Sequence, residues 1–146
     1  MEFAKSGDKT MARKDFSTPN FQYEGSEIFI SVRTQDLPFN LPDNCVIIDM
    51  KGELNLYSTP ALKDILDNLL NDDIVYMLFD MSGMAYIDSS GLGTLVGVQS
   101  RIVKKGGYLR ICSPSESVTN VLNLTKLKQM MRVSNSIEEA VDELGS

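Results

Sequence analysis

The stretch Ile74-Val75-Tyr76-Met77-Leu78-Phe79 is an almost uninterrupted apolar run. A strand that is apolar on both faces is typical of the centre of a sheet that is covered on both sides. The next apolar residues recur at helical spacing and stop near Gly106-Gly107, where a helix would end: Leu92, Leu95, Val96, Ile102 and Val103. A second strand-like run, Tyr108 to Cys112, follows at once. This order predicts a mostly parallel sheet packed by helices.

The residues before this unit extend the same alternation of strands and helices. Alternating apolar and polar side chains predict a half-buried strand at Ile28 to Arg33, and Cys45 to Met50 indicates a more buried one. Asp36 to Asn44 contains two prolines and predicts a loop, in the manner of a long hairpin connection. Ser58-Thr59-Pro60 then provides a hydroxyl cap and a first-turn proline for a helix. Its apolar face is predicted from Leu62, Ile65, Leu66, Leu69 and Leu70.

The residues after Cys112 predict two further helices and a strand. Ser113-Pro114-Ser115-Glu116 places a capping serine, a proline and a glutamate at the spacing of a helix start. A short strand is expected near Met131 to Val133, and Ser136 with Glu139 forms a second capping-box pattern before a last helix. The predicted fold is therefore α/β, with a mixed, mostly parallel sheet of four or five strands and about four helices.

Composition predicts one domain and disfavours several kinds of partner. A chain of 146 residues with 42% hydrophobic content can build one ordinary core. The net charge of −6 would repel a nucleic-acid backbone. The longest apolar runs are much shorter than a membrane helix, and residues 1–20 lack the apolar region of a signal peptide, so we expect a cytoplasmic protein without membrane insertion. Residues 1–25 lack periodicity and predict a mobile tail before a domain at 26–146.

The reactive side chains argue against several enzyme classes. Histidine is absent, which excludes Ser-His-Asp and Cys-His catalysis as well as His-ligated zinc. Cys45 and Cys112 each lie in a strand-like run, and in a chain without secretion signals they predict buried free thiols. We therefore expect no catalytic residues, no metal site and no cofactor.

One segment concentrates the polar features of a site. Ile87-Asp88-Ser89-Ser90-Gly91-Leu92-Gly93 lies beyond the carboxyl end of the central strand, where sites in open α/β sheets usually occur. Two serines at a helix N-terminus would accept a phosphate favourably, because free N–H groups and the helix dipole attract negative charge. The same Asp-Ser-Ser pattern also satisfies ordinary N-capping, and the glycines at 91, 93 and 97 could simply permit close packing of the helix on the sheet.

Together, two motifs resemble the bacterial anti-sigma factor antagonists with a STAS domain. They are Gly52-Glu53-Leu54-Asn55, followed by the helix from Ser58, and the Asp-Ser-Ser-Gly-Leu-Gly segment about 35 residues later. The resemblance covers residues 28–144. It implies that Ser89 is phosphorylated by a partner that is both anti-sigma factor and serine kinase, and that a PP2C-type phosphatase reverses this. The unphosphorylated form would bind the anti-sigma factor and free a sigma factor.

The resemblance also implies a contact surface for the partner. Its expected members are the residues of the two motifs: Asp88, Ser89, Ser90, Gly91, Leu92, Asn55 and Ser58. Asn55 stands where the family commonly has aspartate, which removes a negative charge. The alternatives are a STAS module of a stress-signalling complex, a transporter or lipid transport, and a nucleotide-binding domain. The nucleotide-binding alternative is weakened because the spacing is Gly-x-Gly-x-x-x-Gly and no Walker-type lysine follows.

Overall fold

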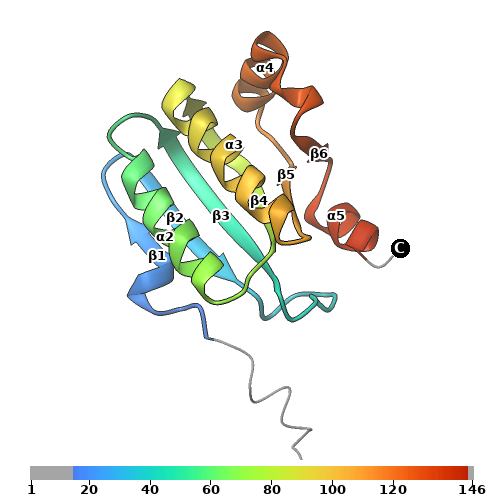
Figure 1. The fold of residues 1–146 in the computed structure, drawn as a ribbon. Helices are drawn as coiled ribbons and strands as arrows, with labels where there is room; N and C mark the ends of the chain where they lie inside the picture. Colours follow the sequence, from blue (N-terminus) through green and yellow to red (C-terminus); the bar gives the residue numbers. More distant parts are fainter. Residues whose placement is uncertain (1–14, 145–146) are drawn as a thin grey trace, which may run out of the picture.

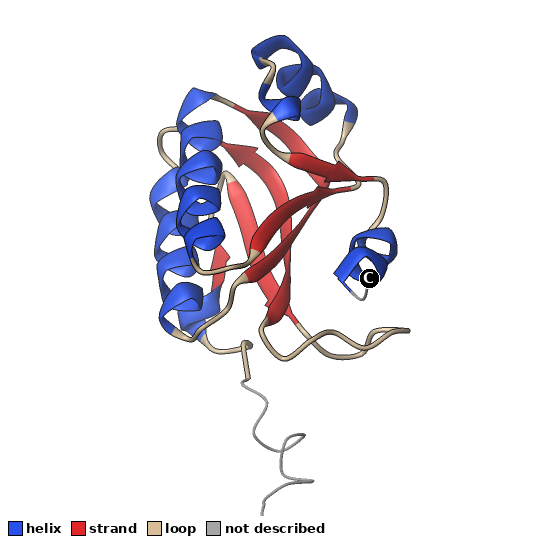
Figure 2. Ribbon diagram, turned by 45° about the vertical axis from the view of Figure 1, so that its right-hand side comes forward, coloured by secondary structure: helices blue, strands red, loops and turns tan. Residues whose placement is uncertain are grey.

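The computed structural model describes residues 15–144, which form one six-stranded mixed sheet with helices on both faces (Figures 1 and 2). The strands lie side by side in the order in which they occur along the chain. β1 and β2 pair antiparallel, as do β2 and β3, and the remaining pairs are parallel. The strands are β1 Gln22–Glu24, β2 Ile28–Arg33, β3 Cys45–Leu54, β4 Tyr76–Ile87, β5 Tyr108–Cys112 and β6 Arg132–Ser134.

The helices divide between the two faces of the sheet. Figure 1 shows α2 and α3 lying next to each other across one face, and Figure 2 shows that α5 lies on the opposite side. Alternate side chains of the strands point to each face, so the sheet contributes to two apolar clusters. The α-helices are α2 Thr59–Asn71, α3 Ser89–Lys104, α4 Glu116–Thr125 and α5 Ile137–Leu144, and two short 3₁₀ turns are η1 Pro19–Phe21 and η2 Leu127–Gln129.

The class of fold and most element positions agree with the sequence prediction. β2 and β5 have the predicted bounds, and the helices at 59 and 89 begin where capping residues indicated. β3 and β4 run further than predicted, to Leu54 and Ile87. Their carboxyl halves mix buried with exposed residues, such as Glu53 in β3 and Tyr86 in β4, so they lack the continuous apolar pattern by which buried strands are recognised.

The predicted tail is wrong for the part that the structure describes. Phe16 and Phe21 are both buried in the main core, with their ring centroids 4.9 Å apart in an edge-to-face arrangement. β1 follows them directly and adds a sixth strand to the sheet. Two aromatic side chains therefore fix a segment that has no periodic pattern, and the folded unit begins before residue 26. Residues 1–14 lie outside the described part of the chain.

Two local details of the C-terminal half test the capping predictions. α4 is capped by Ser115, whose hydroxyl accepts a hydrogen bond from Val118 N at 3.2 Å, and not by Ser113. Ser113 lies in the left-handed region at φ 49° and donates to Asn135 O. The serine half of the capping box before α5 is confirmed, since the Ser136 hydroxyl accepts a hydrogen bond from Glu139 N at 3.1 Å. The Glu139 carboxylate accepts its bond from Asn135 N at 3.4 Å, one residue before the expected donor.

Candidate site for partner binding and modification

The candidate site lies where two neighbouring parallel strands end. Leu54 closes β3 and is the register partner of Ile87, which closes β4. The turn from β3 to α2 and the turn from β4 to α3 therefore lie next to each other at the carboxyl edge of the sheet (Figure 1). This placement brings together the two motifs that the sequence analysis identified, although about 35 residues separate them.

Asp88 connects these two turns through its carboxylate. One carboxylate oxygen accepts a hydrogen bond from Gly91 N at 3.1 Å and caps α3. The other accepts a hydrogen bond from Leu56 N at 3.2 Å in the neighbouring turn. Asp88 N in turn donates to Leu54 O at 3.0 Å. The predicted acid beside the switch thus has a second role, because it holds the β3–α2 turn against the start of α3.

The two serines differ in exposure. Ser89 is the first residue of α3 and is exposed to solvent, and its hydroxyl forms no hydrogen bond with another described residue. Ser90 is half-buried. Only the first of the two hydroxyls is fully presented at the helix N-terminus, where unpaired N–H groups favour an added negative charge. This difference in exposure favours Ser89 over Ser90 as an acceptor of phosphate.

The residues that the resemblance implied as partner contacts do not all reach the surface. Gly91 and Leu92 are buried in the core, and so is Ser58. A Cβ atom on Gly91 would lie 2.7 Å from Leu54 Cγ, so this position has room only for glycine. These three residues have little surface for a direct contact, and their part in partner binding stays a prediction. They support the turns from below, whereas Asn55, Asp88, Ser89 and Ser90 retain some exposure.

Asn55 organises the β3–α2 turn. Its side-chain oxygen accepts hydrogen bonds from Tyr57 N at 2.9 Å and Ser58 N at 3.1 Å, and its amide donates to the Glu27 carboxylate. The Ser58 hydroxyl makes no capping bond to α2 and instead donates to Glu53 O at 2.8 Å. An aspartate at position 55 could accept the same two bonds but could not donate to Glu27. Asparagine at this position thus fits the acidic neighbour that this chain has.

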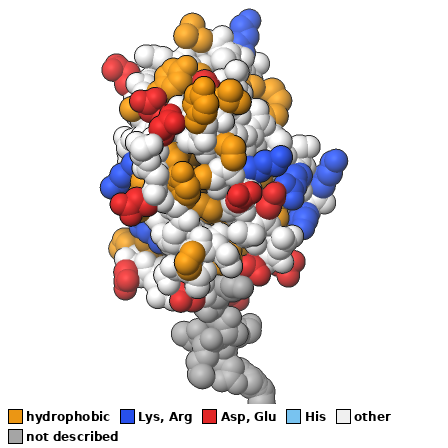
Figure 3. All heavy atoms as spheres, turned by 90° about the vertical axis from the view of Figure 1, so that its left-hand side faces the viewer, with side chains coloured by type: hydrophobic (Ala, Val, Ile, Leu, Met, Phe, Trp, Pro, Cys, Tyr) orange, Lys and Arg blue, Asp and Glu red, His pale blue; other side chains and the backbone are white. Residues whose placement is uncertain are grey.

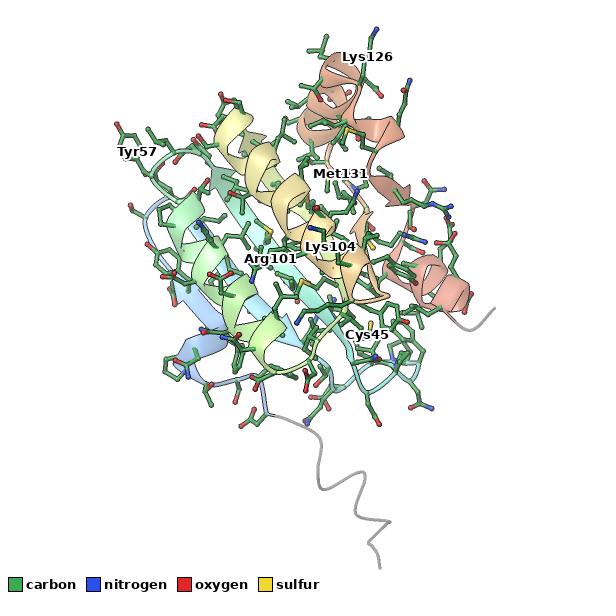
Figure 4. All side chains as sticks on the ribbon, in the orientation of Figure 1. Cys45, Tyr57, Arg101, Lys104, Lys126 and Met131 are labelled. Carbon is green, nitrogen blue, oxygen red and sulfur yellow. The ribbon has the colours of Figure 1, made fainter. Side chains whose placement is uncertain are left out.

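The sequence analysis missed an apolar feature at this turn. Leu56 and Tyr57 are 66% and 80% exposed, although they sit directly beside the Asp88 carboxylate. Figure 4 shows Tyr57 projecting from the turn away from the body of the protein, and Figure 3 shows apolar and acidic side chains next to each other on the upper part of this face. The sequence signal for this feature is a pair of large apolar residues between the end of a strand and the start of a helix, where exposed polar residues are usual. We call residues 55–58 the apolar turn.

A groove runs from the site along α3. It has a volume of about 460 Å³ and lies between α2 and α3, with Ser89 and Ser90 in its lining. Gly93 and Gly97 also line it, and a Cβ atom on either would meet nothing within 4 Å. The reading of these two glycines as close packing of helix on sheet is therefore wrong. They keep the floor of a surface groove free of side chains.

Two titratable groups with a raised pKa lie away from the site, in the apolar cluster under α5. Burial raises the pKa of the Cys112 thiol and of the Tyr108 phenol to about 12 in each case. Arg110 lies 3.8 Å over the Tyr108 ring and pairs with Glu143 at 3.4 Å. Cys45 and Cys112 are buried free cysteines, as predicted. The Cys112 thiol is therefore kept protonated at neutral pH and lacks the thiolate character of a nucleophile.

Between residues 15 and 144, no three His, Cys, Asp or Glu side chains are arranged to hold a metal ion. Within the same range, no helix combines the length and apolar character that crossing a membrane requires.

The fold and site are those of a mixed α/β sheet with α2 and α3 on one face and a serine pair at the start of α3, beside the preceding turn. The STAS domain family model matches residues 37–140, and the chain belongs to this family. A Thermotoga maritima protein described as a candidate anti-sigma factor antagonist is 32% identical over 73% of this chain and 96% of the relative. The anti-sigma-B factor antagonist of Bacillus subtilis is 33% identical over 68% of this chain and 90% of the relative.

Solved structures with this fold include an antagonist in two states. The unphosphorylated anti-sigma factor antagonist SpoIIAA has a TM-score of 0.61 at 22% identity, covering 69% of this chain and 88% of its own. The phosphorylated form of the Bacillus cell fate determinant SpoIIAA has a TM-score of 0.55 at 20% identity, covering 69% and 91%. At these identities the likeness establishes the shared fold alone.

Proposed function

We propose that this protein is an anti-sigma factor antagonist that is switched by phosphorylation of Ser89. In its unphosphorylated form it binds an anti-sigma factor that is also a serine kinase, and this binding frees a sigma factor. The observation that carries the proposal is the exposed Ser89 hydroxyl at the start of α3, held beside the exposed apolar turn by Asp88. Relatives at 32% and 33% identity with names of this kind support it.

The apolar turn supplies the contact area that such binding needs. Exposed aromatic and large aliphatic side chains are typical anchors of protein interfaces, since they bury much area with few rotamers to order. Glu53 is exposed and Asp88 accepts a hydrogen bond from Leu56 N, so the contact surface combines apolar side chains with carboxylates and tolerates little added negative charge. Tyr57 is the anchor that we expect to matter most.

Phosphorylation acts on this surface through charge. The Ser89 oxygen attacks the γ-phosphorus of ATP, the bond to the ADP oxygen breaks, and the hydroxyl proton passes to a base of the kinase. The product carries about −1.5 to −2 charges beside Asp88 and next to the apolar turn. The α3 N-terminus stabilises this charge locally, while an acidic or apolar partner surface is repelled. A phosphatase of the PP2C type then restores the hydroxyl.

This function is regulatory and uses no chemistry of the chain's own. We propose a cytoplasmic protein whose partners are the kinase and the phosphatase, without a cofactor, a nucleic acid or insertion into a membrane. The domain of the proposal comprises residues 26–146 together with the docked segment 15–25. The runner-up function within the family is a STAS module of a stress-signalling complex, a transporter or lipid transport. The nucleotide-binding alternative loses support because Gly91 packs against Leu54 and Ile87 and does not form an open loop.

The test is a pull-down from the native cell followed by mapping of phosphosites by mass spectrometry. The wild-type protein should recover a serine kinase and carry phosphate on Ser89. Ser89→Ala should keep its fold, because losing one exposed hydroxyl at a helix start costs about 0.5–2 kcal/mol, which is less than the stability of a typical domain. It should remain in the binding form, because it cannot be phosphorylated at position 89. Ser89→Asp should weaken binding, though less than a phosphate does, because it adds a single charge.

Ser90→Ala is the matched control, since it removes the neighbouring hydroxyl and should cycle like the wild type. Phosphate found only on Ser90 would contradict the assignment of the acceptor. Recovery of no kinase would contradict the sigma-factor pathway and favour the runner-up.

A further inference from the structure

The hairpin between β1 and β2 carries an exposed carboxylate beside the apolar turn. Glu27 is the last residue before β2 and is exposed to solvent. Its carboxylate accepts a hydrogen bond from the side-chain amide of Asn55, the first residue of the apolar turn. Within residues 15–144, Glu27 forms no ion pair with a cation. The surface therefore carries a negative charge here that no cation of the described chain compensates.

Backbone contacts fix this hairpin against the end of β3. Glu53 N donates a hydrogen bond to Glu27 O at 2.8 Å, and Gly25 N donates to Ile28 O at 2.9 Å. Gly52 adopts φ 110°, and a Cβ atom there would lie 2.2 Å from Glu27 O, so only glycine permits this close approach. Because both the backbone and the carboxylate of Glu27 are held, little conformational freedom is lost when a partner binds to it.

The order of the strands places Glu27 and Ser89 on opposite sides of the apolar turn. β2 runs antiparallel to β3, so it begins at the edge of the sheet where β3 ends, and Ile28 is the register partner of Gly52. β4 lies on the other side of β3 and leads into Ser89 (Figure 1). Two strand spacings of about 4.8 Å put about 10 Å between the β2 side and the β4 side. The contact surface thus has a third part, the hairpin, next to the apolar turn and the start of α3.

We propose that Glu27 is the charged contact of this surface, and that it pairs with an arginine or lysine of the anti-sigma factor kinase while Tyr57 enters an apolar pocket. This inference rests on the proposed function. Asn55 occupies one carboxylate oxygen of Glu27, and the remaining lone pairs can accept the N–H groups of a guanidinium or an ammonium group. A charge at the rim of an interface acts mainly on the choice of partner and on the rate of association. Glu27 is thus the residue by which this surface selects a partner with a basic group opposite β2.

The charged contact and the phosphorylation switch act at different places. A cation bound to Glu27 lies about 10 Å from the β4 side, which exceeds the Debye length of about 8 Å at physiological ionic strength. It therefore neutralises little of the charge of a phosphate on Ser89. Phosphorylation can oppose binding even though the partner presents a cation to Glu27.

The test is calorimetry of the unphosphorylated full chain with the kinase that the pull-down recovers. Glu27→Gln removes the charge but keeps a carbonyl oxygen for the Asn55 amide. We expect the dissociation constant to rise about three- to fivefold, which is the contribution of an exposed ion pair, and to depend less on salt concentration. The double variant Glu27→Gln with Asn55→Asp exchanges donor and acceptor within the same pair and restores the charge, so it should recover most of the wild-type affinity.

Glu138→Gln is the matched control, since it makes the same change at an exposed residue of α5, on the other face of the sheet (Figure 2). It should leave the affinity unchanged. Equal losses of affinity in the two single variants would overturn the proposal in favour of an effect of net charge. A loss in Glu27→Gln that keeps the wild-type salt dependence, or that the double variant does not recover, would overturn it in favour of a role in the shape of the turn.

The outcomes separate this proposal from the proposed function. If the kinase binds the wild type and Glu27→Gln equally well, the function stands and the role of Glu27 is refuted. If native cells yield no kinase partner, the proposed function fails, and the pairing of Glu27 with that kinase fails with it.

Discussion

Replacing Phe21 with alanine tests whether the segment before β2 is part of the folded unit. Phe21 is only 3% exposed and packs edge-to-face on Phe16 beneath α2. Truncation of a buried phenylalanine costs about 3–5 kcal/mol, and the low end applies here because the segment lies at the margin of the core, where the chain can close part of the cavity. We therefore expect the free energy of unfolding to fall by about 3 kcal/mol. Deleting residues 1–25 should cost at least as much.

The matched control is Phe29→Ala, which makes the same chemical change on the neighbouring strand. Phe29 is 37% exposed, so its truncation should cost about 1 kcal/mol. Urea denaturation measures both, and at a slope of about 2 kcal/mol/M the midpoint of Phe21→Ala should fall by about 1.5 M. Equal midpoints for the two variants, with unchanged slopes, would show that residues 15–24 do not dock in solution.

Three further predictions concern the candidate site and the apolar cluster under α5. In thermal unfolding, Gly91→Ala should destabilise the fold by about 1–3 kcal/mol, because the added methyl group overpacks the core. Gly93→Ala should be neutral or stabilising by up to about 1 kcal/mol, because its methyl group would face the open groove. The reverse order of stabilities would contradict these positions of the two glycines. Tyr57→Ala should weaken kinase binding at least tenfold in calorimetry without loss of stability, while the equally exposed Leu124→Ala should not. Burial raises the Cys112 thiol pKa from 9.0 to about 12, so above pH 9 the unfolded chain releases a proton that the folded chain retains. The free energy of unfolding should therefore fall from pH 9 toward 12, and less so in Cys112→Ala; identical pH profiles would refute this.

The sequence was informative where a pattern repeats over several residues. The alternation from Ile28 to Arg33 and the continuous apolar run in β4 each placed a strand, because burial on one or two faces leaves a visible periodicity. β1 has three residues and no such pattern, and its position depends on two aromatic side chains that pack from outside the strand. A short segment that is held in place by two aromatic side chains outside it cannot be recognised from the spacing of its own residues.

The candidate site shows the same division between local and distant causes. The serine pair at the start of α3 is a local signal and was located correctly at a helix start. The sequence does not show that Asp88 reaches Leu56 in another turn, because this hydrogen bond depends on how β3 and β4 pair. Nor does it separate Gly91, which packs on Leu54, from Gly93, which faces an open groove. These distinctions arise only when the elements are placed together.

The agreement between strand order and chain order has a consequence for synthesis. Each strand pairs with the strand that precedes it, so a nascent chain can add strands to one growing edge as they leave the ribosome, without waiting for a distant partner. The surroundings of Ser89 require only β3, β4 and the helices that follow them, which are complete once residue 104 has emerged. Ser89, the acceptor that we propose, can therefore reach its final geometry while β5, β6 and the last two α-helices are still being translated.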